Sequence, residues 1–197
     1  MPMPGHTALG AFAAYMAMWM AMMVAMMLPS LAPTLWRSRR DALILGIGFY
    51  VVWAAVGAAL YPLAFALTAA QSRWPGLLAA VPVASGIVLV LAGCTQLTAW
   101  KAHHLDCCRA PAPGPRTTSS RAWRAGLRLG GHCALCCAGF MTFLLVMGMG
   151  RLAWIVVVAA AITIERVAPW PRIVARTAGI AMLASGVLLT MRALVTS

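Results

Sequence analysis

The sequence predicts an all-α protein, a polytopic membrane helical bundle of about six transmembrane helices. Hydrophobic residues make up 63% of the chain and charged residues only 9%, and the charges are bunched between long apolar runs. A soluble domain carries roughly 25% charged residues. The net charge of +12 does not indicate nucleic acid as a partner, because a nucleic-acid binder needs a basic face on a soluble scaffold.

Six apolar runs are the expected membrane spans, since a helix needs about 20 residues to cross a bilayer. They should be helical, because lipid offers no hydrogen-bond partner to unpaired backbone N–H and C=O groups. The fifth run has only 13 residues before Glu165, so it reaches membrane length only if Glu165 and Arg166 lie in the headgroup region. A tight turn at 148–151 should precede it. We expect one transmembrane domain over residues 1–197, without a cleavable signal peptide. The runs are 7–36, 42–72, 74–100, 129–150, 152–164 and 173–194.

The basic residues predict the orientation. With six spans, 12 of the 15 Lys and Arg residues fall on one side of the membrane and three on the other. The positive-inside rule therefore places the first, third and fifth loops in the cytoplasm and both termini outside. The three on the outer side are Arg73, Arg151 and Arg192. The twelve on the inner side are Arg37, Arg39, Arg40, Lys101, Arg109, Arg116, Arg121, Arg124, Arg128, Arg166, Arg172 and Arg176.

The third loop, at about 101–128, is the sizeable cytoplasmic segment. Its Pro-Ala-Pro-Gly-Pro stretch at 111–115 predicts a flexible linker. Residues 120–128 predict a short basic helix at the interface, where anionic lipid attracts Lys and Arg.

All six cysteines lie between residues 94 and 137, with three of the four histidines. If the third helix continues past Trp100, His103/Cys107 and His104/Cys108 are each one turn apart, and Cys133, Cys136 and Cys137 share one face of the fourth helix. Thiolate and imidazole bind zinc tetrahedrally or copper(I) in low coordination. The reducing cytoplasm disfavours disulfides. Simple packing is the alternative, and it is the stronger one for Cys94 alone.

Methionines crowd the first span, where Met16, Met20, Met23 and Met27 form one stripe. Thioethers favour copper(I), but methionine also fills gaps between helices. Met26 and Met27 matter most, because they lie beside Pro29 at the depth expected for the cysteines.

Glu165 is the only glutamate in the chain. At the C-terminal end of the fifth helix it meets an unfavourable helix dipole, so it needs a cation. Arg166, Arg172 or a metal would serve, and an interfacial ion pair is the simpler interpretation.

Several motifs together resemble a bacterial family, domain of unknown function 2182, described as predicted metal-binding integral membrane proteins. The resemblance covers about residues 15–190. It implies a helical membrane fold and a soft-metal site with no known reaction. With the charge count, we expect a multi-pass protein of the bacterial inner membrane with both termini in the periplasm. The resemblance also implies that His104 stands at the position of a family cysteine, with Cys107 at a neighbouring position and Ala138 where an aromatic residue is common. The motifs are Ala25-Met26-Met27-Leu28-Pro29-Ser30, the segment from Ala92-Gly93 through Gln96-Leu97-Thr98 to Lys101, Cys108-Arg109-Ala110-Pro111, Cys133-x-x-Cys136-Cys137, Gly148-Met149 and Glu165-Arg166.

The main hypothesis is a membrane protein that binds a soft metal ion, with copper favoured and zinc possible, at the cytoplasmic ends of the third and fourth helices. The alternatives are a non-catalytic helical subunit of a larger membrane complex and a membrane thiol-disulfide oxidoreductase, in which Lys101 or Arg109 would lower a thiol pKa. Expected partners are the lipid bilayer and other membrane subunits or a metal-delivery protein. The candidate ligands are Cys133, Cys136, Cys137, Cys108, His104, Cys107, His132, Met26 and Met27.

Overall fold

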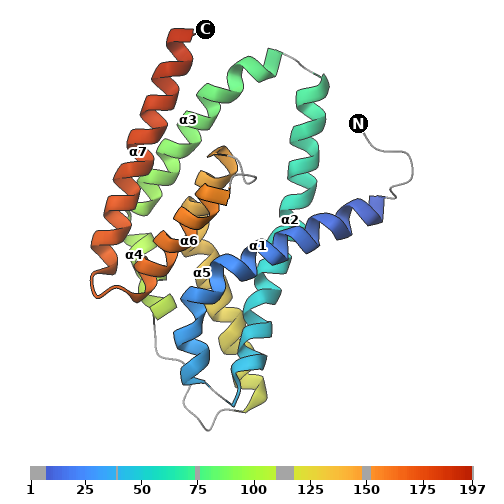
Figure 1. Cartoon of the computed structure of the whole chain (residues 1–197), viewed down its shortest axis with the longest axis vertical. Coiled ribbons are helices and arrows are strands. Elements are labelled where there is room, and N and C mark those ends of the chain that lie inside the picture. Colours follow the sequence, from blue (N-terminus) through green and yellow to red (C-terminus); the bar gives the residue numbers. More distant parts are fainter. Residues whose placement is uncertain (1–7, 39, 74–75, 110–117, 148–151, 197) are drawn as a thin grey trace.

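The computed structural model describes residues 8–38, 40–73, 76–109, 118–147 and 152–196, and the secondary structure in these ranges is helical (Figure 1). This confirms the all-α membrane bundle. The helices are α1 (Ala8–Arg37), α2 (Ala42–Arg73), α3 (Gly76–Gln96), α4 (Ala99–Arg109), α5 (Ser119–Met147), α6 (Leu152–Val167) and α7 (Pro171–Thr196).

Among the described residues, α1, α2, α5 and α7 are each long and apolar enough to cross a membrane. The pair α3 and α4 gives a fifth candidate if the two count as one bent span. The fifth expected run is α6, whose 16 residues extend about 24 Å, less than the roughly 30 Å of the hydrocarbon core. The expected total of six crossings therefore stays a prediction.

The condition that the third helix continues past Trp100 is not met, because the helix breaks before that residue. α3 ends at Gln96, and α4 leaves it at an angle of 63°. Thr98 explains the break, because its hydroxyl donates to the carbonyl of Thr95 at 2.7 Å and accepts from the backbone N–H of Lys101 at 3.3 Å. The second bond caps a new helix. The His and Cys spacing survives, since those residues all lie on α4.

The expected cytoplasmic loop is mostly helical in its described part. α4 covers its first residues, and α5 begins at Ser119, ten residues before the expected start of the fourth span. Residues 120–128 are therefore helical, but as part of α5 and not as a separate helix. The proposed linker at 111–115 and the turn at 148–151 lie outside the described residues, as do Arg39, Arg116 and Arg151.

α1 bends in its last third (Figure 1). Pro29 and Pro33 lie inside this helix, and each lacks the N–H that a straight helix would use. The residues around the bend face the rest of the bundle, and Met23, Met26, Met27 and Leu31 are fully buried.

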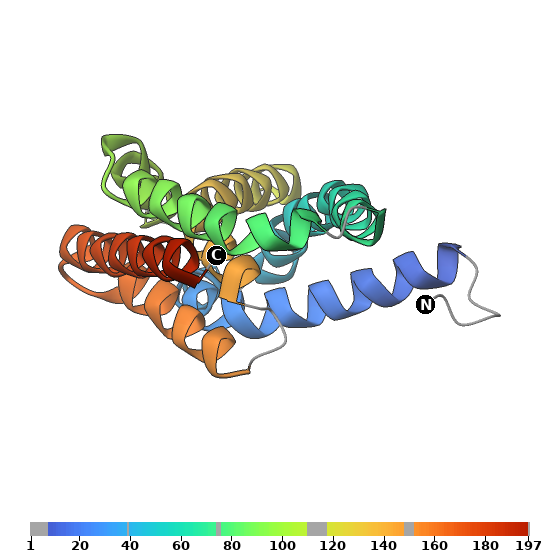
Figure 2. The same ribbon diagram turned by 90° about the horizontal axis from the view of Figure 1, so that it is seen from above.

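The helices pack in pairs, with α3 along α7 and α2 along α5, while α1 contacts α2 and α6. Figure 2 shows α3 and α7 side by side, and α6 lies between α7 and α1. Large apolar side chains cover much of the outside, for example Leu43, Ile47 and Val51 on one face of α2. A lipid environment accounts for such a surface, which water does not favour.

The α1–α2 connection and the start of α5 lie at one end of the molecule, and the end of α7 lies at the other (Figure 1). Which end faces the cytoplasm stays a prediction from the charge count.

Candidate metal site

Five buried sulfur-bearing side chains gather where α1, α4 and α5 meet, and we call them the sulfur cluster. The exposed fraction of each is 5% or less. α5 supplies three of them, because positions three and four apart lie on one helix face. That face also buries Phe140 and Leu144. The members are Met27, Cys108, Cys133, Cys136 and Cys137.

Two other sulfurs of the cluster lie close to that of Cys133. Cys133 Sγ lies 3.8 Å from Cys137 Sγ and 3.9 Å from Met27 Sδ. With metal–sulfur bonds of about 2.3 Å, as in zinc thiolates, three sulfurs around one ion in their plane lie about 4 Å apart. The two spacings measured from Cys133 match that value.

Cys136 links the rest of the cluster. Its side chain is close enough to interact with those of Cys108 on α4 and Cys137 on α5. Met26, the other methionine expected at the site, is fully buried and packs in the same core. The sulfur that lies against Cys133 is that of Met27.

The histidines stand at the edge of the cluster. His104 Nδ1 on α4 lies 2.9 Å from His132 Nδ1 on α5, and both side chains are half-buried. We call them the histidine pair. The ring of Trp100 packs against His104, with centroids 4.5 Å apart. Cys107 is elsewhere, beside His103 on the exposed side of α4, with Sγ 3.8 Å from Nε2.

α4 carries Lys101, Asp106 and Arg109 besides its histidines, so we treat it as lying outside the membrane-spanning segments. Partial burial lowers the pKa of His104, and the nearby His132 and His103 rings lower it further. A neutral imidazole is the form that binds a metal.

A buried ion pair flanks the sulfur cluster. Lys101 Nζ lies 3.0 Å from Glu165 Oε1 and also donates to the backbone carbonyl of Cys136 at 2.6 Å. The only lysine thus pairs with the only glutamate, at 2% and 1% exposure. Glu165 was expected to need a cation, but Lys101 was not considered as that cation. The sequence did contain a signal for this pair: each is the single residue of its type, they carry opposite charges, and both lie near the ends of expected spans.

Arg166 is a second buried cation beside the thiols. Its guanidinium interacts with Cys133, Cys108 and Cys137, and its Nη1 donates to Ser30 Oγ on α1 at 3.0 Å. Its Nη2 is buried and has no hydrogen-bond partner among the described residues. Arg109 holds the end of α6 by donating to the carbonyls of Glu165 and Arg166.

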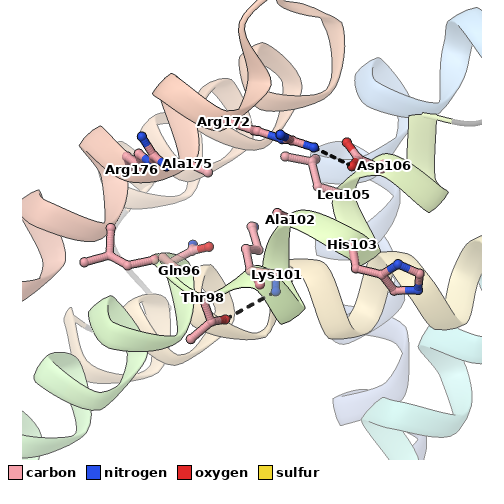
Figure 3. Close-up of a pocket in the computed structure, with 12 residues that line it drawn as sticks. Gln96, Thr98, Lys101, Ala102, His103, Leu105, Asp106, Arg172, Ala175 and Arg176 are labelled. Carbon is pink, nitrogen blue, oxygen red and sulfur yellow. Dashed lines mark hydrogen bonds and ion pairs between the residues drawn. The ribbon is translucent and has the colours of Figure 1, made fainter.

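A cavity of about 530 Å³ lies on another side of α4, where the break after α3 faces α7 (Figure 3). Its lining mixes polar and apolar side chains and includes the exposed ion pair of Arg172 with Asp106, 3.2 Å apart. None of its lining residues is a cysteine or methionine. This cavity is therefore separate from the sulfur cluster.

Within the described part of the chain, no three or more His, Cys, Asp or Glu side chains form a group that could hold a metal ion. The three close sulfurs are a different kind of group, because one of them belongs to a methionine. Two thiols and a thioether form a soft donor set of the kind that selects copper(I).

Comparison with known proteins gives one match. A family model named PpoB2 and described as a copper chaperone matches residues 16–189. The metal-related family implied by the resemblance is thus supported, under a description that names copper and not as domain of unknown function 2182. Neither the curated proteins nor the solved structures contain a match.

Proposed function

Because the chain belongs to the PpoB2 copper chaperone family, we propose that it holds one copper(I) ion in the sulfur cluster, between Cys133, Cys137 and Met27, as cargo for a copper-requiring acceptor. The observation that carries this proposal is the pair of sulfur–sulfur distances, 3.8 and 3.9 Å. Each of the two distances matches the spacing expected between sulfurs that share one ion.

The buried charges support copper(I) between two thiolates. Lys101, Glu165 and Arg166 are buried and together carry one net positive charge. Copper(I) with two thiolates and a neutral thioether carries one net negative charge. A buried charge is costly unless it is compensated, so the bound ion and its surroundings would neutralise each other.

Copper is favoured over zinc for this cluster. Soft thioether donors select copper(I), whereas zinc takes four N, S or O ligands in structural sites. Nothing in the comparisons supports the zinc alternative. Binding and release of copper(I) need no change of oxidation state, so the proposal requires no catalysed reaction.

The location of the site in a helical membrane bundle is consistent with a protein that delivers copper from the membrane. We propose a multi-pass protein of the bacterial inner membrane that acts as one transmembrane domain, whose acceptor or donor is another membrane subunit or a metal-delivery protein. A membrane thiol-disulfide oxidoreductase would instead predict that these cysteines cycle between thiol and disulfide.

The test is copper(I) binding by the purified full chain in detergent under anaerobic, reducing conditions. Cys133→Ser with Cys137→Ser should abolish stoichiometric binding, because a hard oxygen donor replaces thiolate. The matched control is Cys94→Ser with Cys107→Ser, which changes two cysteines outside the cluster and should bind like wild type.

Circular dichroism and gel filtration of both double variants establish that they fold. Wild-type copper content in a folded Cys133/Cys137 variant would reject the proposed site. Oxidised cysteines trapped in cells without copper would favour the oxidoreductase.

A further inference from the structure

The sulfur cluster is closed to copper carriers in solution. The exposed fractions of Cys133, Cys137 and Met27 are 0%, 1% and 0%. A copper(I) ion that ends between these sulfurs must first bind donors nearer the surface. Each bond that it loses to a ligand of the carrier has to be replaced by a bond to a donor of this protein.

Resting on the proposed function, we infer that the histidine pair, His104 and His132, is the entry site for copper(I) and passes the ion through Cys136 to Cys133, Cys137 and Met27. The two Nδ1 atoms are 2.9 Å apart and come from different helices. An ion bound to both nitrogens at about 2.0–2.1 Å holds them roughly 3.3 Å apart at a tetrahedral angle and roughly 4 Å apart in a linear arrangement. The rings must therefore separate by about 0.4–1.2 Å to admit it, a movement that side-chain rotation can supply.

A series of neighbouring donors leads inward from this pair. Cys136 lies one helical turn from His132 on α5, and its side chain interacts with those of Cys108 and Cys137. Cys137 Sγ lies 3.8 Å from Cys133 Sγ, and that sulfur lies 3.9 Å from Met27 Sδ.

Helical spacing places the second step beside the first. Cys108 follows His104 by four residues on α4, and Cys136 follows His132 by four on α5. Each cysteine is one turn from its histidine on the same helix.

Donor chemistry gives the transfer its direction. The outer donors are imidazole nitrogens, and the inner ones are thiols and a thioether, which copper(I) prefers. At Cys136 a copper–sulfur bond forms as a copper–nitrogen bond to the histidine pair and the S–H bond break. When the ion moves on, the copper–sulfur bond to Cys136 breaks and Cys136 takes up the proton of Cys137, while the proton of Cys133 and the one first released by Cys136 leave to water. Copper remains copper(I) throughout, so no oxidant or reductant is needed.

The test separates the rate of loading from the final affinity. Copper(I) is presented to the full chain as its coloured bathocuproine disulfonate complex, and the loss of colour is followed by anaerobic stopped flow. His104→Leu should slow loading by about tenfold or more, the range seen when groups supporting a metal site are removed, while the equilibrium affinity stays at the wild-type value.

His104→Met is the matched variant, because Met and Leu are nearly equal in volume and only Met offers a donor atom for copper(I). It should load at the wild-type rate. His103→Leu, at the exposed neighbouring position, should also load normally.

Equal rates for His104→Leu and His104→Met would overturn the inference, as would slow loading by His103→Leu. A loss of affinity in His104→Leu as large as in the Cys133 and Cys137 variants would also overturn it, since His104 would then be a ligand in the final complex. Failure of the wild type itself to bind copper(I) would instead reject the proposed function.

Discussion

Met26 and Met27 are neighbours on α1 and are equally buried, but the sulfur that lies against Cys133 belongs to Met27. Leu nearly matches Met in volume, so Met27→Leu should cost less than about 1.5 kcal/mol of stability. It removes the thioether, so copper(I) affinity should fall by about tenfold or more. Competition with a copper(I) chelator measures that affinity.

Met26→Leu is the control for this experiment. It makes the same change at an adjacent, equally buried position, and copper(I) affinity should stay at the wild-type value. If both variants bind copper(I) like wild type, Met27 serves packing and the site is confined to the cysteines.

Arg166 tests the charge balance at the site. Its guanidinium interacts with three thiols of the cluster, so Arg166→Gln removes the positive charge that compensates a copper bis-thiolate. We expect copper(I) affinity to fall by about tenfold, with all sulfur donors still present. Chelator competition on the folded variant gives the value.

Arg172→Gln provides the comparison, because Arg172 pairs with Asp106 on the surface, with 68% of its side chain exposed. Its removal should leave copper(I) affinity unchanged, since exposed pairs are screened by solvent. An equal effect of both substitutions would mean that overall charge, and not the buried guanidinium, controls binding.

The residue types of the site could be predicted from the sequence, but their partners could not. Cys133, Cys136 and Cys137 share a face through their spacing alone, and the structure buries all three. Lys101 and Glu165 lie 64 positions apart, so their pairing depends on how α4 and α6 pack. Likewise, Cys107 and Cys108 are adjacent, and only the placement of α4 decides that Cys108 turns inward.

At the scale of elements, the approach of α5 to α2 depends on glycine. A Cβ at Gly126 would clash with the carbonyl oxygen of Leu45, a backbone atom that cannot move without shifting α2. Gly126→Ala should therefore destabilise the protein by about 1–3 kcal/mol, the usual cost of overpacking. Thermal unfolding in detergent measures the change.

Gly131 on the same helix is the matched position, with nothing within 4 Å of an added Cβ. Gly131→Ala should leave the stability unchanged or raise it by up to about 1 kcal/mol, since alanine favours the helix. Equal loss of stability in both variants would contradict the close approach of α2 and α5.

The helices also show which features of the fold sequence patterns predict and which they do not. Long apolar runs predict α1, α2 and α7 well, because membrane length is encoded in composition. The break between α3 and α4 depends on the local bonds of Thr98, which leave no trace in hydropathy. The bend of α1 is signalled by Pro29 and Pro33, but its direction, which brings Met27 to Cys133, follows from packing.

At the scale of the whole molecule, α6 decides the topology. It has 16 residues, yet it runs from the end where α5 finishes back to the end where α7 begins (Figure 1). α6 and α7 thus run in opposite directions, as a helical hairpin does. A chain with this arrangement should expose the residues after α5 and the residues after α7 on the same side of the membrane.

Alkaline phosphatase fusions test this topology, because the enzyme is active only in the periplasm. Twelve of the 15 basic residues belong to the loops assigned to the cytoplasm, and the positive-inside rule makes that assignment. Fusions after Met147 and after Thr196 should therefore both be active, and a fusion after Arg40 inactive. Activity after Met147 without activity after Thr196 would mean that α6 does not cross, and activity after Arg40 would reverse the whole orientation and expose the α1–α2 connection to the periplasm.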